Sequence, residues 1–179
     1  WSAKDGYPGH PQYREFHRDL GWDLPIERLA PLGLTHPRPL SLKLHRVTDH
    51  GVSLDRKKPY QPSVAAQQVR DHATHYLKGR RLQLDQLSDA MDAAPLLVAP
   101  FDAELFGHWW FEGPAFLGEL FRQGSRENVA FTNLREVLNK SGQLQLCDPS
   151  PSSWGQGGYH NYWLNETNSW IVPEWERAS

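Results

Sequence analysis

The residues with the clearest chemical potential follow an apolar run near the middle of the chain. In "LLVAPFDAELFGHWWFEGP", Leu96 to Pro114, the carboxylates of Asp102 and Glu104 and the imidazole of His108 stand among aromatic residues. Two carboxylates two residues apart lie on the same side of an extended backbone, which suits acid and base chemistry. The structural alternative is that Asp102 caps the next turn and Glu104 pairs with an arginine, and the Asp-x-Glu pattern alone favours this alternative.

The segment that leads into Asp102 has the pattern of a buried strand. "APLLVAPFD" is short and continuously apolar, which is typical of a strand covered on both faces of a parallel sheet. The loops that leave the carboxyl ends of parallel strands converge on one mouth, and this mouth carries the chemistry. We therefore expect Asp102 at the functional edge of a sheet.

Two helices are predicted on either side of this strand. From Pro62 to Asp92 the apolar residues fall at helical spacing, and Gly79 is the position at which this helix would divide. In "GPAFLGELFRQG", Pro114 marks the start of a second helix and Gly124 its end.

Further elements complete a strand and helix series. Alternating leucines predict a half-buried strand near 40 to 48. "NVAFTNLREVLNKSG" predicts a strand and then a helix with Thr132 as N-cap, and "GQLQLC" predicts another strand. Residues 1–39 are rich in proline and glycine and fit only short helical turns, such as Pro11 to Leu20. The expected fold class is α/β, part of a parallel-stranded, barrel-like domain built by residues 40–179.

Composition narrows the classes of partner and compartment. Nineteen Lys and Arg against 21 Asp and Glu give a net charge of -2, so no electrostatic basis exists for binding nucleic acid or an anionic membrane. The single cysteine, Cys147, excludes an internal disulfide and favours a reducing compartment, so we expect a cytoplasmic protein. No apolar run approaches the roughly 20 residues of a membrane span. The chain begins at Trp1 without Met, which we interpret as a piece of a longer protein.

Aromatic and histidine residues suggest what is bound. Eight tryptophans stand mostly in polar or glycine-rich surroundings, and exposed flat rings suit flat ligands such as the C–H faces of sugars. His72 and His75 are spaced for a metal pair on the predicted helix, yet no third ligand with suitable spacing and no HExxH motif is present. We therefore predict no metal and no cofactor.

Three motifs resemble glycoside hydrolase family 57, and the branching enzymes of that family in particular. "APFDAELFGHWWFEGP" is similar to the family's fourth sequence region, "WSAKDGYPGHPQYREFHRD" to an earlier segment, and "PSSWGQGGYHNYWLN" to a later one. The motifs occur in the family's order and run from Trp1 to about Trp170.

The resemblance implies a retaining α-glucan-active enzyme on a (β/α)7 barrel, with a glutamate nucleophile and an aspartate acid/base. Asp102 falls on the acid/base position. A hydrophobic wall from Phe101, Phe106 and Trp109 would raise the pKa of this acid so that it holds its proton until the leaving group needs it.

The resemblance also implies what lies outside these residues. The family's nucleophile motif stands upstream of the segment that begins at Trp1 and does not occur here. Residues 1–179 are therefore interpreted as the middle-to-late part of the catalytic region, with the rest of that region as a partner. The isolated chain is expected to be inactive.

Substrate contacts are implied residue by residue. Trp1, Trp154 and Trp163 correspond to tryptophans of the family's glucan subsites, and Gly9 to a close backbone contact. His108 either hydrogen-bonds a sugar hydroxyl or is a core residue. The expected function is 1,4-α-glucan branching in glycogen biosynthesis. The alternatives are an α-amylase or 4-α-glucanotransferase of the same family, or a glucan-binding protein without catalysis.

Overall fold

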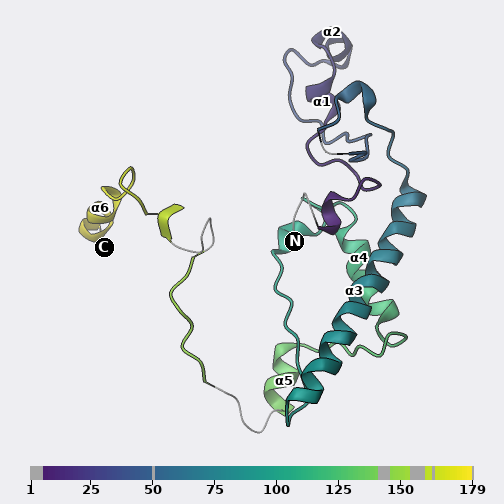
Figure 1. Cartoon of the computed structure of the whole chain (residues 1–179). Helices are drawn as coiled ribbons and strands as arrows, with labels where there is room; N and C mark the ends of the chain where they lie inside the picture. The colour runs from purple at the N-terminus through teal and green to yellow at the C-terminus, as the bar shows by residue number, and fades with distance from the viewer. Residues whose placement is uncertain (1–5, 50, 141–145, 154–159, 163, 179) are drawn as a thin grey trace. The chain divides into compact units, whose positions relative to one another are not determined.

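The computed structural model describes residues 6–49, 51–140, 146–153, 160–162 and 164–178. Contacts divide the chain into two compact units, Trp1–Thr132 and Asn133–Ser179. Figure 1 draws both. Each unit is described by itself.

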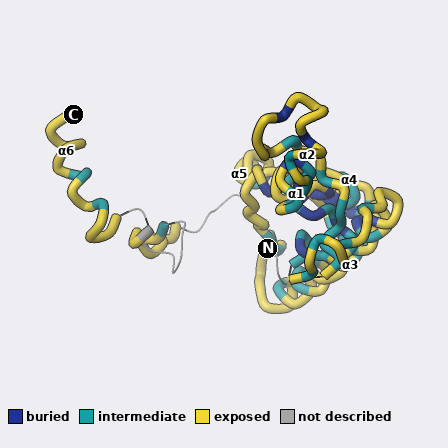
Figure 2. Tube along the Cα trace, turned by 90° about the horizontal axis from the view of Figure 1, so that it is seen from above, coloured by how far each residue is buried: buried dark blue, intermediate teal, exposed yellow. Residues whose placement is uncertain are grey.

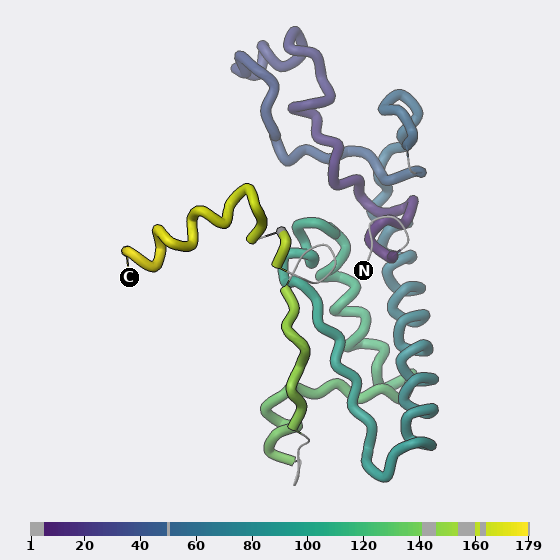
Figure 3. The backbone as a smooth tube through the Cα atoms, turned by 60° about the vertical axis from the view of Figure 1, so that its left-hand side comes forward, coloured from purple at the N-terminus to yellow at the C-terminus, as the bar shows by residue number. Residues whose placement is uncertain are grey.

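Two helices form the centre of the first unit. α3 (Pro62–Ala90) and α4 (Gly113–Gly124) lie along one another (Figures 1 and 3). Their facing sides supply most of the buried apolar side chains, which Figure 2 shows in dark blue. On α3 these residues recur every four positions, as the 3.6-residue period requires, and they are Ala65, Val69, Ala73 and Leu77; on α4 they are Phe116 and Leu120. Both predicted helices are confirmed, and α3 runs through Gly79 without a break.

The segment before α3 is built from short turns. It contains the 3₁₀ helices η1 (Tyr7–Gly9), η2 (Ala30–Leu32) and η3 (Leu54–Arg56) and the single-turn helices α1 (Leu20–Asp23) and α2 (Ile26–Leu29). This agrees with the expected loop-rich region, except that Pro11 to Leu20 forms turns rather than a helix.

One buried aspartate ties this segment together. The Asp19 carboxylate accepts hydrogen bonds from the backbone N–H groups of Gly21 and Leu40, each at 2.9 Å. Although burial alone would raise it, these hydrogen bonds and the charge of Lys43 hold the pKa of Asp19 below its ordinary value. The Asp19 side chain therefore caps α1 and also binds the backbone of Leu40, which lies 21 positions further along the chain.

The predicted strands are wrong for the residues that the structure describes, and most of the strand predicted at "GQLQLC" lies outside them. Pairing there is limited to isolated bridges, such as Arg14 with Arg46 and His45 with Pro59. The apolar run before Asp102 has no helix and no partner strand, and Leu96 and Val98 are 46% and 66% exposed. A strand requires a neighbour for its N–H and C=O groups, and among the described residues of this unit none lies alongside. The described part of the chain is therefore mostly helical.

The described residues of the second unit include the helical segments α5 (Leu134–Lys140), η6 (His160–Tyr162) and α6 (Ile171–Ala178). The helix predicted after Thr132 is confirmed as α5, but the cap is Asn133, whose side chain accepts a hydrogen bond from the Glu136 N–H at 3.0 Å. None of the described helices combines the length and apolar composition that crossing a bilayer requires.

Close packing between α4 and the loop before it predicts that position 113 tolerates no side chain larger than that of glycine. A Cβ atom at Gly113 would lie 2.9 Å from the Phe106 Cα atom, which is backbone and cannot turn away. Gly113→Ala should therefore lower the free energy of unfolding by about 1 to 3 kcal/mol. Urea denaturation followed by circular dichroism measures this change.

The matched control is Gly79→Ala on α3, where a Cβ atom meets nothing within 4 Å. Alanine in an open helix interior is worth about 0.5 to 1 kcal/mol over glycine, so this variant should be as stable as the parent or more so. Equal midpoints for the two variants would contradict the proposed clash.

Candidate functional site

Asp102 opens a compact loop that precedes α4. It stands directly before the 3₁₀ helix η4 (Ala103–Leu105), and its backbone oxygen accepts a hydrogen bond from the Leu105 N–H at 3.1 Å. The Trp110 N–H closes the loop by donating to the Leu105 oxygen at 2.8 Å, and Gly107 allows the reversal with a φ of 97°. The side chain of Asp102 is exposed at the start of this loop.

The surroundings of the two carboxylates differ from both the predicted arrangement and its structural alternative. The backbone turns into η4 after Asp102, so Asp102 and Glu104 do not share one side of an extended chain. The side chain of Asp102 also makes no capping hydrogen bond. The hydrophobic wall predicted from Phe101, Phe106 and Trp109 does not enclose Asp102, because Asp102 is exposed.

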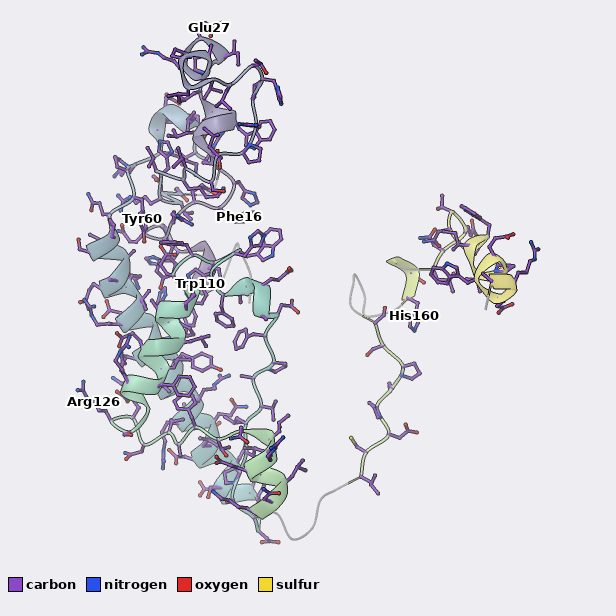
Figure 4. All side chains as sticks on the ribbon, turned by 180° about the vertical axis from the view of Figure 1, so that it is seen from behind. Phe16, Glu27, Tyr60, Trp110, Arg126 and His160 are labelled. Carbon is purple, nitrogen blue, oxygen red and sulfur yellow. The ribbon has the colours of Figure 1, made fainter. Side chains whose placement is uncertain are left out.

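Two buried side chains hold this loop against the helices. Leu105 and Trp110 are 1% and 3% exposed and belong to the apolar core. The Trp110 ring lies 4.9 Å from the ring of Phe116 on α4 and 5.6 Å from that of Tyr13. Figure 4 labels Trp110 where the loop meets the helices. The position of Asp102 therefore follows from core packing.

A buried carboxylate fixes the far end of the loop. Glu112 precedes α4 and accepts a hydrogen bond from the Arg14 N–H at 3.0 Å. Burial raises the pKa of Glu112, while hydrogen bonds from Arg14 and Tyr60 act in the opposite direction. Glu112 thus joins the loop to two segments that are distant in sequence.

Two cavities flank the loop. The first, here the Trp109 cavity, has a volume of about 580 Å³, and its lining includes Gly9, Glu15, Phe16, Arg18, Lys57 and Trp109. The second, here the histidine cavity, has a volume of about 460 Å³, and its lining includes Tyr7, His10, His72, His75, Phe101 and Trp110. Pro8 lines both. Volumes in this range are typical of small-molecule sites.

Histidines and tyrosines pair in the second cavity. The hydroxyl of Tyr13 lies 2.8 Å from Nδ1 of His72, and that of Tyr7 lies 2.6 Å from Nδ1 of His75. Burial, with the nearby His10 and His75, lowers the pKa of His72 to about 4, so its ring is neutral at pH 7. Burial raises the pKa of Tyr13, so its hydroxyl keeps its proton at neutral pH and shares a hydrogen bond with His72.

The predicted site residues fall into two groups. Gly9 is buried and lines the Trp109 cavity, and exposed His108 contacts the Phe16 and Trp109 rings edge to face at 5.4 and 5.2 Å. Trp1, Trp154 and Trp163 lie outside the described residues. The structure therefore brings together Gly9, the neighbourhood of His108 and the loop of Asp102.

Sequence reasoning missed the charged partners of this site. Lys57 and Glu15 form an ion pair at 2.6 Å although 42 positions separate them, and no local sequence pattern predicts such a pair. His72 and His75 were noticed as possible metal ligands, but the structure gives each a tyrosine partner. The residues that the structure describes contain no group of three or more metal-ligating side chains.

Known proteins resemble the chain over nearly its whole length, although no family model matches it. A 1,4-alpha-glucan branching enzyme of Thermococcus kodakarensis is 33% identical over 179 residues, covering 99% of this chain and 24% of that enzyme. The crystal structure of the glycoside hydrolase family 57 branching enzyme from this organism superposes with a TM-score of 0.81 at 32% identity, covering 99% of this chain and 30% of that chain. The alpha-amylase AmyC of Thermotoga maritima superposes with a TM-score of 0.80 at 37% identity, covering 97% and 32%.

These similarities define the class of protein that the chain resembles. Over nearly its whole length it is similar to 1,4-alpha-glucan branching enzymes and to a solved enzyme of glycoside hydrolase family 57. It spans about a quarter of the length of the curated relative to which it is similar.

The neutral state of His72 predicts a pH-dependent stability. Between pH 6.5, its ordinary pKa, and about pH 4 the unfolded chain binds a proton at this position that the folded chain does not. Stability should therefore fall as the pH decreases through this window, and His72→Gln, which keeps an acceptor for Tyr13, should flatten the decrease. Thermal melting midpoints at pH 7.5, 6.0 and 5.0 measure it.

The control is His160→Gln, because His160 is exposed in the second unit. Its melting midpoints should follow those of the parent at every pH. If His72→Gln keeps the full pH dependence of the parent, the neutral buried state assigned to His72 is wrong.

Proposed function

We propose that the full-length protein is a 1,4-α-glucan branching enzyme, which cleaves α-1,4 bonds and forms α-1,6 bonds in glycogen-like glucan in the cytoplasm. The observation that carries this proposal is the similarity to a 1,4-alpha-glucan branching enzyme across 99% of the chain, including the loop of Asp102. The substrate is an α-glucan, and no metal or cofactor takes part.

In this proposal Asp102 is the general acid/base. Its exposed carboxyl group, on a loop fixed by Leu105 and Trp110, is open to a substrate and held in place by the core. General acid catalysis requires such positioning before any tuning of the pKa. Trp1, Gly9, His108, Trp154 and Trp163 are the proposed substrate contacts.

The proposal includes a (β/α)7 barrel to which other parts of the protein contribute. The run that contains the exposed residues Leu96 and Val98 is extended and apolar, so it suits a strand that neighbouring strands and helices cover. The rest of the catalytic region, including the glutamate nucleophile, is the proposed partner of this surface.

Hydrolysis by an α-amylase is the second candidate. The observation that favours it is the 37% identity to the alpha-amylase AmyC, which exceeds the identity to the branching enzyme. Both activities cleave the same bond and differ in whether a sugar hydroxyl or water receives the glycosyl group. Incubation of amylose with the full-length protein separates them, since branching creates α-1,6 bonds and hydrolysis creates reducing ends alone.

The acid/base assignment predicts the effect of one substitution. Asp102→Asn keeps the shape of the side chain but delivers no proton, so turnover of amylose should fall by about 10²- to 10⁴-fold. Glucan affinity measured by calorimetry should change little. Glu104→Gln is the matched control, because Glu104 lies on the same loop and is also exposed. A larger loss in the control would move the role to Glu104.

The branching assignment predicts a second effect, at Trp154. An incoming sugar stacks on an aromatic ring, whereas water needs no such contact, so Trp154→Ala should reduce transfer more than hydrolysis. Stacking contributes roughly 0.5 to 1.5 kcal/mol beyond buried area, so the ratio of new α-1,6 bonds to new reducing ends should fall several-fold. Equal losses of both products would contradict an acceptor role for Trp154.

A further inference from the structure

We infer that Thr48 is a positioning residue for the glucan substrate, because its strained backbone and its hydroxyl group hold the segment that carries Gly9. The inference rests on the proposed function, in which Gly9 contacts substrate. It adds a residue that acts through Gly9 and its neighbours rather than by touching the sugar. Thr48 is not among the residues assigned above to substrate or to catalysis.

The backbone at Thr48 is strained. Its φ is 68°, and a positive φ is an outlier for a β-branched residue. The N–H of Asp49 donates to the backbone oxygen of Val47 at 2.8 Å. A hydrogen bond of this span around a residue with positive φ defines the rare and strained form of the γ-turn. Such strain persists only where surrounding contacts impose it, and it occurs preferentially at functional sites.

The turn holds the segment of Gly9 through two hydrogen bonds. The Val47 N–H donates to the Tyr13 backbone oxygen at 2.8 Å, and the Thr48 N–H donates to that of Pro11 at 3.0 Å. In a regular strand consecutive N–H groups point to opposite sides, so the pairing departs from a strand at this point. Pro11 stands two residues after Gly9. The γ-turn therefore ends the pairing and fixes the chain beside Gly9.

The hydroxyl group of Thr48 joins this turn to a third segment. The Arg46 N–H donates to the Lys58 backbone oxygen at 3.0 Å. In a regular antiparallel pair the Lys58 N–H would donate back to Arg46. Instead it donates to Oγ1 of Thr48 at 2.9 Å, and the Thr48 hydroxyl donates to the Arg46 oxygen at 3.1 Å. The hydroxyl thus connects a donor and an acceptor that would otherwise pair directly.

Glycine would remove the strain but not replace the side chain. The same part of the chain uses glycine at positive φ, at Gly33 with 80° and at Gly51 with 73°, where no strain arises. A threonine at such a φ needs a compensating interaction. The two hydrogen bonds of its hydroxyl group provide one, and they are lost in glycine and in valine.

Residues on both sides of the turn line the Trp109 cavity, together with Gly9, Glu15 and Lys57. The backbone oxygen of Val47 accepts a hydrogen bond from Nζ of Lys57 at 2.9 Å, and Lys57 pairs with Glu15 at 2.6 Å. Displacement of the turn would therefore move Gly9 and this ion pair together. Groups that contact a substrate lose affinity when they are misplaced even slightly.

The test measures binding of maltoheptaose to the full-length protein by calorimetry, with Asp102→Asn in every variant to prevent turnover. Thr48→Val keeps the branched shape without the hydroxyl and should raise the dissociation constant roughly 3- to 10-fold. Thr48→Ser keeps the hydroxyl and should bind as the parent does. Thr48→Gly lacks the hydroxyl but adopts a positive φ freely, so it should stay folded where valine does not, and it should also weaken binding.

The matched control is Thr74→Val on α3. The Thr74 hydroxyl lies 2.6 Å from Oε1 of Gln123 and 3.0 Å from the backbone oxygen of Arg70. Its loss should lower the melting midpoint and leave the dissociation constant equal to that of the parent. Amide hydrogen exchange gives a second measurement, because exchange in residues 9–15 should become faster in Thr48→Val and stay unchanged in Thr74→Val.

An unchanged dissociation constant in Thr48→Val and Thr48→Gly would overturn the inference, even with a lower melting midpoint, because Thr48 would then only stabilise the fold. An equal loss of affinity in Thr48→Ser or in Thr74→Val would also overturn it, as would a parent that does not bind maltoheptaose. The linkage assay on amylose is separate. If no α-1,6 bonds form but maltoheptaose affinity depends on the Thr48 hydroxyl, the branching proposal fails and the positioning role stands.

Discussion

Burial of Leu105 and Trp110 against α4 is the interaction on which the candidate site depends. An exposed carboxylate at the start of a loop does not by itself fix the conformation of that loop. Here its two apolar residues are almost fully buried and pack with Phe116 and Tyr13, so displacement of the loop would expose core surface. At about 25 cal/mol for each Å² of apolar surface, two large side chains supply several kcal/mol against such movement. The Glu112 carboxylate also accepts a hydrogen bond from the Arg14 N–H, which fixes the far end of the loop.

The helices could be predicted because their signals are local. Apolar residues at four-residue spacing gave α3, and a proline and a glycine at the two ends gave α4. Gly79 left α3 unbroken because a single glycine costs only about 1 kcal/mol in a helix, less than the packing of Ala73 and Leu77 around it provides. Local patterns of this kind need no knowledge of the rest of the chain.

The strands could not be predicted from their own sequence, since a strand exists only beside a partner. The apolar pattern before Asp102 reports a segment that suits burial, and it is the same pattern whether a neighbour is present or absent. In the described residues Leu96 and Val98 remain exposed. The site shows the same division. Asp102 and Gly9 were predicted from motifs, whereas the pairing of Glu15 with Lys57 joins positions too distant for any local spacing to indicate.

The two cavities beside the loop differ in the charge of the side chains that line them. In the histidine cavity, burial keeps His72 neutral and tyrosine hydroxyls satisfy the imidazoles, so the groups there have completed their hydrogen bonds. In the Trp109 cavity, a charged pair remains beside an aromatic face that is partly exposed. Charges are costly to bury, and a fold retains them at little loss only where each has a partner. Glu15 and Lys57 meet this condition, because each neutralises the other beside the aromatic face.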